Sequence, residues 1–295
     1  MIFAFACAAL TLAATPVDEP IRFDAKRRPV VSIRIDDRLA VDMLVDTAAQ
    51  TSLLTQTASA ALALPPTGDQ VTVNGVAGSV AAPVVAVRRM HNALIDVRDT
   101  ALIAVANIGV TDAQGILGMD LFQGRRLAFD LTARQVTATG SSAAPAGYVA
   151  VAGRRDDKGL LHVPVTIDGV SVDALVDTGA EGSVADAATL GLLGIRDDDP
   201  RLKANGTITG AATGGRAVRR ATVGRLSLGP VTFRDVPLTF TARDDGKPRL
   251  ILGMDLLGPM QRFAVDLGRA ELQIHVPPRD TRSTTPPRAQ EKSGS

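Results

Sequence analysis

The stretch LVDTGAEGSVAD at residues 175–186 decides the fold of this chain. The apolar residues Val172, Ala174, Leu175 and Val176 predict a buried strand. Thr178 and Gly179 then predict a sharp turn, because glycine tolerates the φ values of tight turns. Asp177 would therefore lie at the end of a buried strand and inside a turn. Taken alone, such an Asp is more often a turn residue whose side chain caps local backbone N–H groups.

A second copy of this stretch changes that interpretation. Residues 41–54 read VDMLVDTAAQTSLL and align without a gap with VDALVDTGAEGSVA at 172–185. The alignment makes Asp46 the counterpart of Asp177. A carboxylic acid repeated in the same setting indicates a pair of reagents rather than two unrelated turns.

The likeness continues downstream of both Asp residues. The sequence GILGMDL at 115–121 recurs as LILGMDL at 250–256, and FDLTARQV at 129–136 recurs loosely as VDLGRAELQI at 265–274. The chain is thus an internal duplication. Two long repeats predict a pair of similar lobes that face each other, since a solenoid needs three or more short units.

These motifs resemble those of the retropepsin-like and pepsin-like aspartic peptidases. The ILGMDL motif resembles the sequences of their bacterial retropepsin-like branch. The resemblance covers nearly the whole chain between its two ends. It implies an all-β, two-lobed acid-protease fold, built as a pseudo-twofold pair of retropepsin-like β-barrel domains. The second repeat has the complete Asp177-Thr178-Gly179 motif, whereas Asp46-Thr47 is followed by Ala48 in place of Gly. This departure concerns catalysis and not the fold.

The resemblance also implies a chemistry for the two acids. Two carboxylates within about 3 Å of each other cannot both ionise cheaply, so one holds a proton while the other is charged. The charged member can take a proton from a water that attacks a peptide carbonyl, while the protonated member donates to the developing oxyanion. We therefore expect Asp46 and Asp177 to be the catalytic dyad of an aspartic endopeptidase. Their near symmetry leaves open which of them is protonated at rest.

Residues around the dyad are assigned support roles by the same resemblance. The catalytic loops would be held by Thr47, Ala48, Thr178 and Gly179. The two threonines would bond across to the opposite lobe. The segments ILG at 116–118 and 251–253 would form apolar backing behind each loop, where glycine allows close approach. Asp120 and Asp255, which follow these segments, are interpreted as structural, with Asp120 placed to cap a short helix.

Each repeat also predicts a hairpin between its Asp turn and its ILG segment. These hairpins are VTVNGVAGSV at 71–80 and TITGAATGGRAV at 207–218. In the family, a hairpin at this place is the flap that closes over substrate; the alternative is a plain surface hairpin. The resemblance assigns flap and substrate-binding roles to Gly75, Val76, Gly78, Gly210, Ala211 and Gly214.

The ends of the chain and its middle suggest the division into domains. The N-terminal apolar run is too short to span a bilayer and resembles a secretory leader, although no basic residue precedes it. TGSSAAPAG indicates a linker, and the Pro- and Ser-rich C-terminus predicts disorder. We expect a leader at 1–20, a first lobe at 21–138, a linker at 139–147, a second lobe at 148–276 and a disordered tail at 277–295. The leader would make the protein periplasmic or secreted.

Composition narrows the chemistry further. The 295 residues are 45% hydrophobic and carry 32 basic against 31 acidic residues, so nothing predicts capture of nucleic acid or of an anionic membrane. His91, His162 and His275 lack ligand spacing, and Cys7 is the single cysteine. The chemistry is left to carboxylates or hydroxyls, with no metal or organic cofactor implied.

Other function classes fit less well. A serine hydrolase is disfavoured because no G-x-S-x-G occurs and Ser183 has no base partner in the sequence. A phosphate or dinucleotide site is disfavoured because GAATGG at 210–215 has the wrong spacing. The serious rival is a non-catalytic peptide-binding protein on the same fold, disabled by Ala48. In either case a peptide or protein is the expected partner. A monomer is expected because both halves carry the full set of elements.

Overall fold

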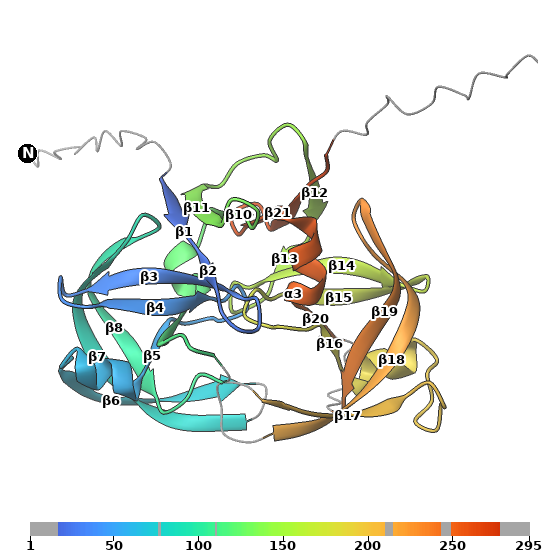
Figure 1. The fold of residues 1–295 in the computed structure, drawn as a ribbon, viewed down its shortest axis with the longest axis horizontal. Coiled ribbons are helices and arrows are strands. Elements are labelled where there is room, and N and C mark those ends of the chain that lie inside the picture. Colours follow the sequence, from blue (N-terminus) through green and yellow to red (C-terminus); the bar gives the residue numbers. More distant parts are fainter. Residues whose placement is uncertain (1–16, 76–77, 110, 210–214, 243–248, 278–295) are drawn as a thin grey trace, which may run out of the picture.

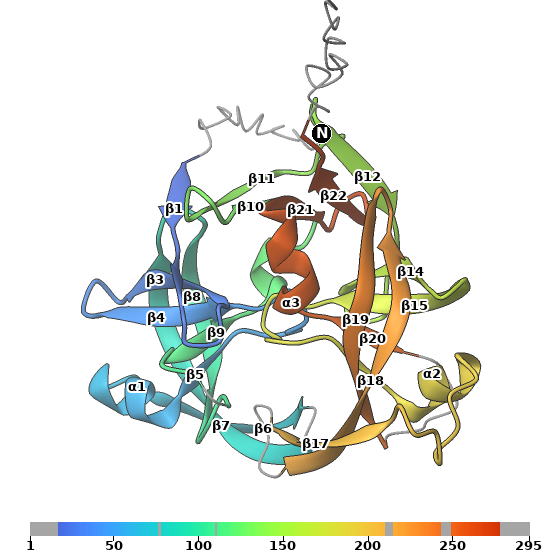
Figure 2. The same ribbon diagram turned by 45° about the vertical axis from the view of Figure 1, so that its right-hand side comes forward.

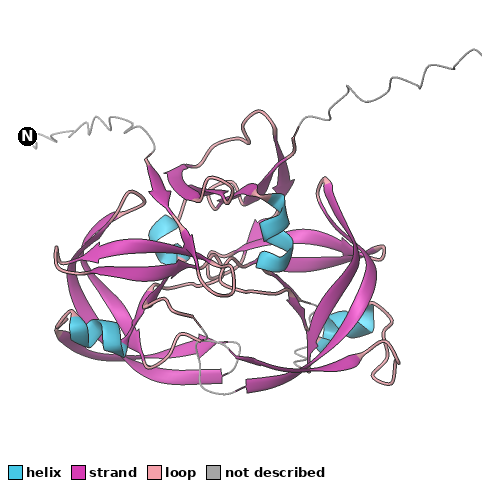
Figure 3. Cartoon of the chain, in the orientation of Figure 1, coloured by secondary structure: helices cyan, strands magenta, loops and turns pink. Residues whose placement is uncertain are grey.

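The computed structural model describes residues 17–75, 78–109, 111–209, 215–242 and 249–277. The chain forms two similar lobes, one on each side, with a third layer of strands above and between them (Figure 1). Strands dominate both lobes, and the few helices are short (Figure 3). Within the described ranges, no helix is long and apolar enough to cross a membrane. Most of the predicted tail and most of the predicted leader lie outside the described residues.

The first lobe is an eight-stranded sheet that curls into a barrel. Its strands run in the order β2-β3-β4-β9-β5-β8-β7-β6, and an additional β3–β7 pairing closes a ring of six. The strands are β2 (Arg22–Phe23), β3 (Pro29–Ile35), β4 (Ala40–Val45), β5 (Leu53–Thr55), β6 (Pro66–Gly75), β7 (Gly78–His91), β8 (Asp96–Val105) and β9 (Gly115–Leu117). The helices are α1 (Gln56–Ala61) and the short 3-10 helix η1 (Met119–Phe122).

The second lobe repeats this plan with the same strand order. Its sheet runs β13-β14-β15-β20-β16-β19-β18-β17, and a β14–β18 pairing closes the ring. The strands are β13 (Arg154–Arg155), β14 (Leu161–Ile167), β15 (Val170–Val176), β16 (Val184–Ala185), β17 (Lys203–Thr209), β18 (Gly215–Leu228), β19 (Val231–Thr241) and β20 (Leu250–Leu252). The helices are α2 (Ala187–Leu192), α3 (Met254–Leu257) and η2 (Gly258–Met260). The predicted all-β, two-lobed, duplicated fold is therefore confirmed.

A third sheet joins the two lobes. Its order is β1-β11-β10-β21-β22-β12 (Figures 1 and 2). Strand β10 of the first repeat therefore pairs directly with strand β21 of the second. The strands are β1 (Asp18–Pro20), β10 (Arg125–Asp130), β11 (Gln135–Gly140), β12 (Tyr148–Ala152), β21 (Arg262–Asp266) and β22 (Glu271–His275). At its centre, Phe129 pairs with Phe263, and their buried rings stack with centroids 4.9 Å apart. The shared sheet fixes one lobe relative to the other.

The first strand of the hairpin that leads to the Asp46 loop follows from its side-chain pattern. In β3, Val31, Ile33 and Ile35 are buried while Ser32 and Arg34 are exposed, which is the period of two expected for a strand with one buried face. β3 and β4 form an antiparallel hairpin, as do β14 and β15 in the second lobe, and each hairpin ends at an Asp loop.

The turns of these hairpins require backbone that most residues avoid. Asp36 and Asp37 have φ of 50° and 54°, and in the second lobe Asp168 and Gly169 have 48° and 90°. Asp and Gly are among the residues that tolerate this left-handed region. The turns thus place each buried strand so that it ends at an Asp loop.

Candidate active site

Asp46 and Asp177 lie at corresponding points, immediately after β4 and β15. The Asp46 N–H donates to Leu117 O at 3.1 Å, and the Asp177 N–H donates to Leu252 O at 3.0 Å. These bonds continue the parallel pairing of β4 with β9 and of β15 with β20. The ILG segments therefore run beside each Asp loop. Because parallel neighbours bond at regular spacing, the start of each loop is fixed by the sheet.

The two Asp loops are interlocked by their threonines. The Thr47 hydroxyl donates to Val176 O at 2.7 Å, and the Thr178 hydroxyl donates to Val45 O at 2.6 Å. Both threonines are fully buried. Each hydroxyl thereby bonds to the backbone just before the opposite Asp. This crossing brings Asp46 and Asp177 together from strands of different lobes.

The two carboxyls share a confined space and interact directly. The Ala48 N–H donates to Asp46 Oδ1 at 2.9 Å, and the Gly179 N–H donates to Asp177 Oδ1 at 2.8 Å. Burial raises the pKa of Asp177 well above its ordinary value, and the neighbouring charge of Asp46 raises it further. Burial also raises the pKa of Asp46, but backbone N–H groups, a hydrogen bond with Asp177 and the charge of Arg28 oppose that rise. The pair therefore holds one proton more tightly than isolated Asp residues would.

Gly179 and Ala48 occupy corresponding places, but they are not equivalent. Neither has a positive φ, so the turn does not require glycine for its backbone angles. Gly179 is required for space instead, because a Cβ there would lie 2.5 Å from Asp46 Oδ2. Ala48 carries a Cβ at the corresponding place in the first loop. Asp177 must therefore sit farther from Ala48 than Asp46 sits from Gly179, and the twofold symmetry of the dyad is inexact.

Serine and aspartate side chains support each loop from behind. Asp120 Oδ1 accepts from the Ser52 N–H at 3.0 Å and from the Ser52 hydroxyl at 2.8 Å, and Ser52 Oγ accepts from Gly118 N at 3.0 Å. In the second lobe, the Ser183 hydroxyl donates to Asp255 Oδ1 at 2.7 Å. The predicted helix cap at Asp120 is wrong: the cap position of η1 is Gly118, with no side-chain cap bond. The Asp120 carboxylate instead binds Ser52, which is buried beside it.

The turn at residues 24–28 reaches the second lobe and was not predicted from the sequence. Arg28 is buried, and its Nη1 donates to Gly179 O at 3.0 Å. Lys26 Nζ lies 2.9 Å from Glu181 Oε2, also across the lobes. The sequence does hold a weak indication of this turn, because an Asp precedes the first hairpin by the same distance in both repeats, at Asp24 and Asp156.

The two flap candidates are the β6–β7 and β17–β18 hairpins, one from each lobe. They lie on the same side of the molecule, opposite the shared sheet (Figures 1 and 2). At the first tip, Gly75 pairs with Gly78; at the second, the pairing runs to Thr209 and Gly215. Four of the predicted flap residues lie outside the described residues: Val76, Gly210, Ala211 and Gly214.

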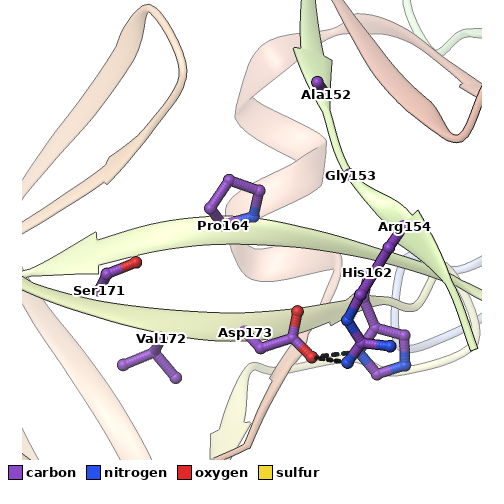
Figure 4. A pocket seen from close by; sticks show the side chains of 8 residues that line it. All are labelled: Ala152, Gly153, Arg154, His162, Pro164, Ser171, Val172 and Asp173. Carbon is purple, nitrogen blue, oxygen red and sulfur yellow. Dashed lines mark hydrogen bonds and ion pairs between the residues drawn. The ribbon is translucent and has the colours of Figure 1, made fainter.

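Two hollows among the described residues do not include the dyad in their lining. One of about 290 Å³ lies over β14 and β15, where His162 Nδ1 is 2.9 Å from Asp173 Oδ2 and Arg154 binds the same carboxylate (Figure 4). Another, of about 660 Å³, is lined in part by Lys26 and Glu181. Neither hollow contains the acids that are repeated in the two lobes, so the paired Asp loops remain the candidate active site.

Two similar β-barrels that meet at a pair of Asp-Thr loops define an acid-protease architecture. A comparison with known families agrees: the aspartyl protease family matches residues 31–121 and 163–256, one match in each lobe and together more than half of the chain. No curated protein matches the chain significantly. The chain belongs to the aspartyl protease family, and the two matches correspond to its two fused retropepsin-like repeats.

Proposed function

We propose that this protein is an aspartic endopeptidase in which Asp46 and Asp177 activate a water for attack on a peptide bond. The observation that carries the proposal is the crossed pair of threonine bonds, because it brings two carboxyls from different lobes into direct interaction. Two carboxyls with raised pKa values share a proton, which supplies an acid and a base at one place.

The reaction needs nothing beyond this pair and water. The carboxylate takes a proton from the water while the water oxygen bonds to the peptide carbonyl carbon. The carboxylic acid gives its proton to the carbonyl oxygen, so the pair keeps its net charge. The residue that took the water proton then gives it to the amine nitrogen, the other carboxylate takes a proton from a hydroxyl of the tetrahedral intermediate, and the C–N bond breaks, which restores the starting pair. The two flap hairpins, with Gly75 and Gly78 at the described tip, would cover an extended peptide above the dyad.

The setting of the enzyme is part of the same proposal. A single chain would suffice, since each lobe contributes one Asp loop and the shared sheet fixes the lobes together. A secreted or periplasmic location rests on the apolar N-terminal sequence. Sedimentation of the mature protein and cell fractionation would test these two points.

The second candidate is a peptide-binding protein without catalysis, and Ala48 is the observation that favours it. The Ala48 methyl occupies a place where the second loop has only a hydrogen, next to the carboxyls. This group could displace the water or the substrate carbonyl. Both acids are nevertheless present, and the Ala48 N–H still donates to Asp46 Oδ1. We therefore favour the peptidase.

The deciding experiment is digestion of a peptide library by the wild type, by Asp46→Asn and by Asp177→Asn, with and without pepstatin. We expect cleavage by the wild type only, and its inhibition by pepstatin. Circular dichroism of both variants controls for folding. If the wild type binds peptides but cleaves none, the binding-protein candidate is correct. If Asp46→Asn keeps full activity, the dyad is wrongly assigned.

A further inference from the structure

The turn before the first hairpin is built by the same hydrogen bonds in both lobes. In the first lobe, Asp24 N donates to Arg28 O at 3.1 Å, and Asp24 Oδ1 accepts from Arg28 N at 2.9 Å. In the second lobe, Asp156 N donates to Leu160 O at 3.0 Å, and Asp156 Oδ1 accepts from Leu160 N at 2.9 Å. Arg28 and Leu160 thus occupy the same position of one repeated turn. A buried cation in one lobe corresponds to a buried hydrocarbon in the other.

The Arg28 guanidinium is held in a fixed orientation. Its Nε and Nη2 donate to Asp24 Oδ2 at 2.9 and 2.6 Å, and Thr111 Oγ1 donates to the same oxygen at 3.0 Å. These bonds outweigh burial and lower the pKa of Asp24, so the two residues form an ion pair. The Nη1 group, on the other edge of the guanidinium, donates to Gly179 O in the opposite lobe. A planar guanidinium with both edges engaged has little freedom to turn away.

Gly179 connects this cation to one member of the dyad. A Cβ on Gly179 would overlap the Asp46 carboxyl, so Gly179 packs directly against Asp46. The carbonyl of that same residue accepts from Arg28. The positive charge therefore lies on the Asp46 side of the dyad. The corresponding turn of the second lobe presents Leu160, which has no charge to offer Asp177.

The other charged groups near this side do not cancel the difference. Lys26 and Glu181 form an ion pair with each other across the lobes. Asp24 occupies the Nε and Nη2 edge of Arg28 and not the edge that faces Gly179. On the other side, the Ala48 methyl adds apolar surface in the loop that faces Asp177, which disfavours a charge there. The Arg28 charge and the Ala48 methyl therefore both favour the negative charge on Asp46 rather than on Asp177.

We propose that Arg28 is a positioning residue that makes the two carboxyls unequal, keeping Asp46 as the carboxylate that takes the proton from water and Asp177 as the acid that donates to the carbonyl oxygen. In turnover, Asp46 becomes protonated and Asp177 becomes the carboxylate, so charge and protons balance. The roles in turnover rest on the proposed peptidase function. The resting position of the proton does not, since the charge of Arg28 acts on the dyad whether or not substrate is cleaved.

The test is a titration of the dyad in the full chain labelled with carboxyl-¹³C aspartate. Signals are assigned by comparison with Asp46→Asn and Asp177→Asn. The main variant is Asp24→Asn with Arg28→Leu, because leucine already fills this position in the second lobe and Asn keeps the oxygen that caps the turn. We expect the lower of the two dyad pKa values to rise by about half to one unit. The acidic limb of kcat/KM against pH should move upward by the same amount.

Two controls separate charge from structure. Arg28→Lys keeps the charge, and we expect it to keep the lower pKa near the wild-type value. Arg22 lies in the same N-terminal segment as Arg28 but is not among the charges that act on the dyad. Arg22→Leu removes its ion pairs to Asp42 and Asp112 and should leave the titration unchanged. If the double variant does not fold, Arg28→Gln is titrated instead, since its amide can still donate to Gly179 O without the charge.

The outcomes distinguish this inference from the proposed function. An unchanged lower pKa in a folded variant without the Arg28 charge overturns the role of Arg28, even if the wild type is an active peptidase. A raised lower pKa supports that role even if the wild type cleaves nothing, because the titration needs no turnover. An equal rise in Arg28→Lys would show that the Gly179 contact, and not the charge, is responsible, and would overturn the proposal.

Discussion

Thr47 and Thr178 exchange hydrogen bonds in both directions: the Thr47 N–H donates to Thr178 Oγ1 at 3.2 Å, and the Thr178 N–H donates to Thr47 Oγ1 at 3.0 Å. Each hydroxyl also donates to a carbonyl of the opposite lobe. Both side chains therefore accept one bond and donate another without any contact with water. The position of each catalytic loop depends on the presence of the other.

Replacing Thr178 by Val should destabilise the protein by about 2–4 kcal/mol, since valine has nearly the same shape but leaves Thr47 N and Val45 O buried without their partner. Urea unfolding measures the change. Thr178→Ser is the matched control, because it keeps the hydroxyl, and it should cost clearly less. A Val variant as stable as the Ser variant would show that the crossed bonds contribute little.

Gly179→Ala should lower kcat/KM by at least about 100-fold, because the added Cβ would overlap the Asp46 carboxyl and displace it from the dyad. Ala48→Gly makes the opposite change at the corresponding position, and should leave the activity intact or raise it. Steady-state assays of both variants on one peptide measure the contrast.

The control for this pair is the fold of each variant, followed by circular dichroism and thermal unfolding. Two results would contradict the interpretation. If Gly179→Ala is fully active, the overlap is relieved without cost to the dyad. If only Ala48→Gly cleaves peptides while the wild type is inert, the Ala48 methyl is a disabling change and the binding-protein candidate is correct.

Ser183→Ala should lower stability by about 1–3 kcal/mol and keep peptidase activity within about tenfold of the wild type. The Ser183 hydroxyl donates to Asp255 Oδ1 and accepts from Gly253 N at 3.0 Å, so it holds the loop and has no free role as a nucleophile. Urea unfolding and a peptide assay measure the two effects. Loss of all activity in a folded Ser183→Ala protein would reopen the serine hydrolase alternative.

Features set by neighbouring residues could be predicted from the sequence. The strand that ends at Asp177 is visible in its apolar run, and the duplication gives Asp46 the same setting. The paired barrels follow from the same repeats through the family resemblance. Pattern and turn chemistry act over a few residues, which is why these predictions succeeded.

Features set by distant contacts could not be predicted in this way. Arg28 reaches Gly179 across 151 positions of sequence, and nothing in its local pattern distinguishes it from a surface arginine. Asp120 was assigned to a local helix cap, but Ser52, 68 positions away, binds its carboxylate. The sheet that joins the lobes pairs strands of different repeats, so its strand order could not be predicted from the sequence of either repeat alone.

The stability of the protein should fall as pH rises above the ordinary Asp pKa, and Asp177→Asn should flatten that fall. Burial raises the pKa of Asp46 and Asp177 in the folded state, so these two residues bind more protons in the folded protein than in the unfolded chain in this range. The corresponding stability is fully present below the unfolded value of 3.8 and is lost as pH rises through the folded values, at about 1.4 kcal/mol per unit of pKa shift. Urea unfolding of both proteins at pH 4, 5, 6 and 7 measures the difference, which cancels the titration of groups outside the dyad. Equal slopes for both proteins would show that the folded state does not hold the Asp177 proton more tightly than the unfolded chain does.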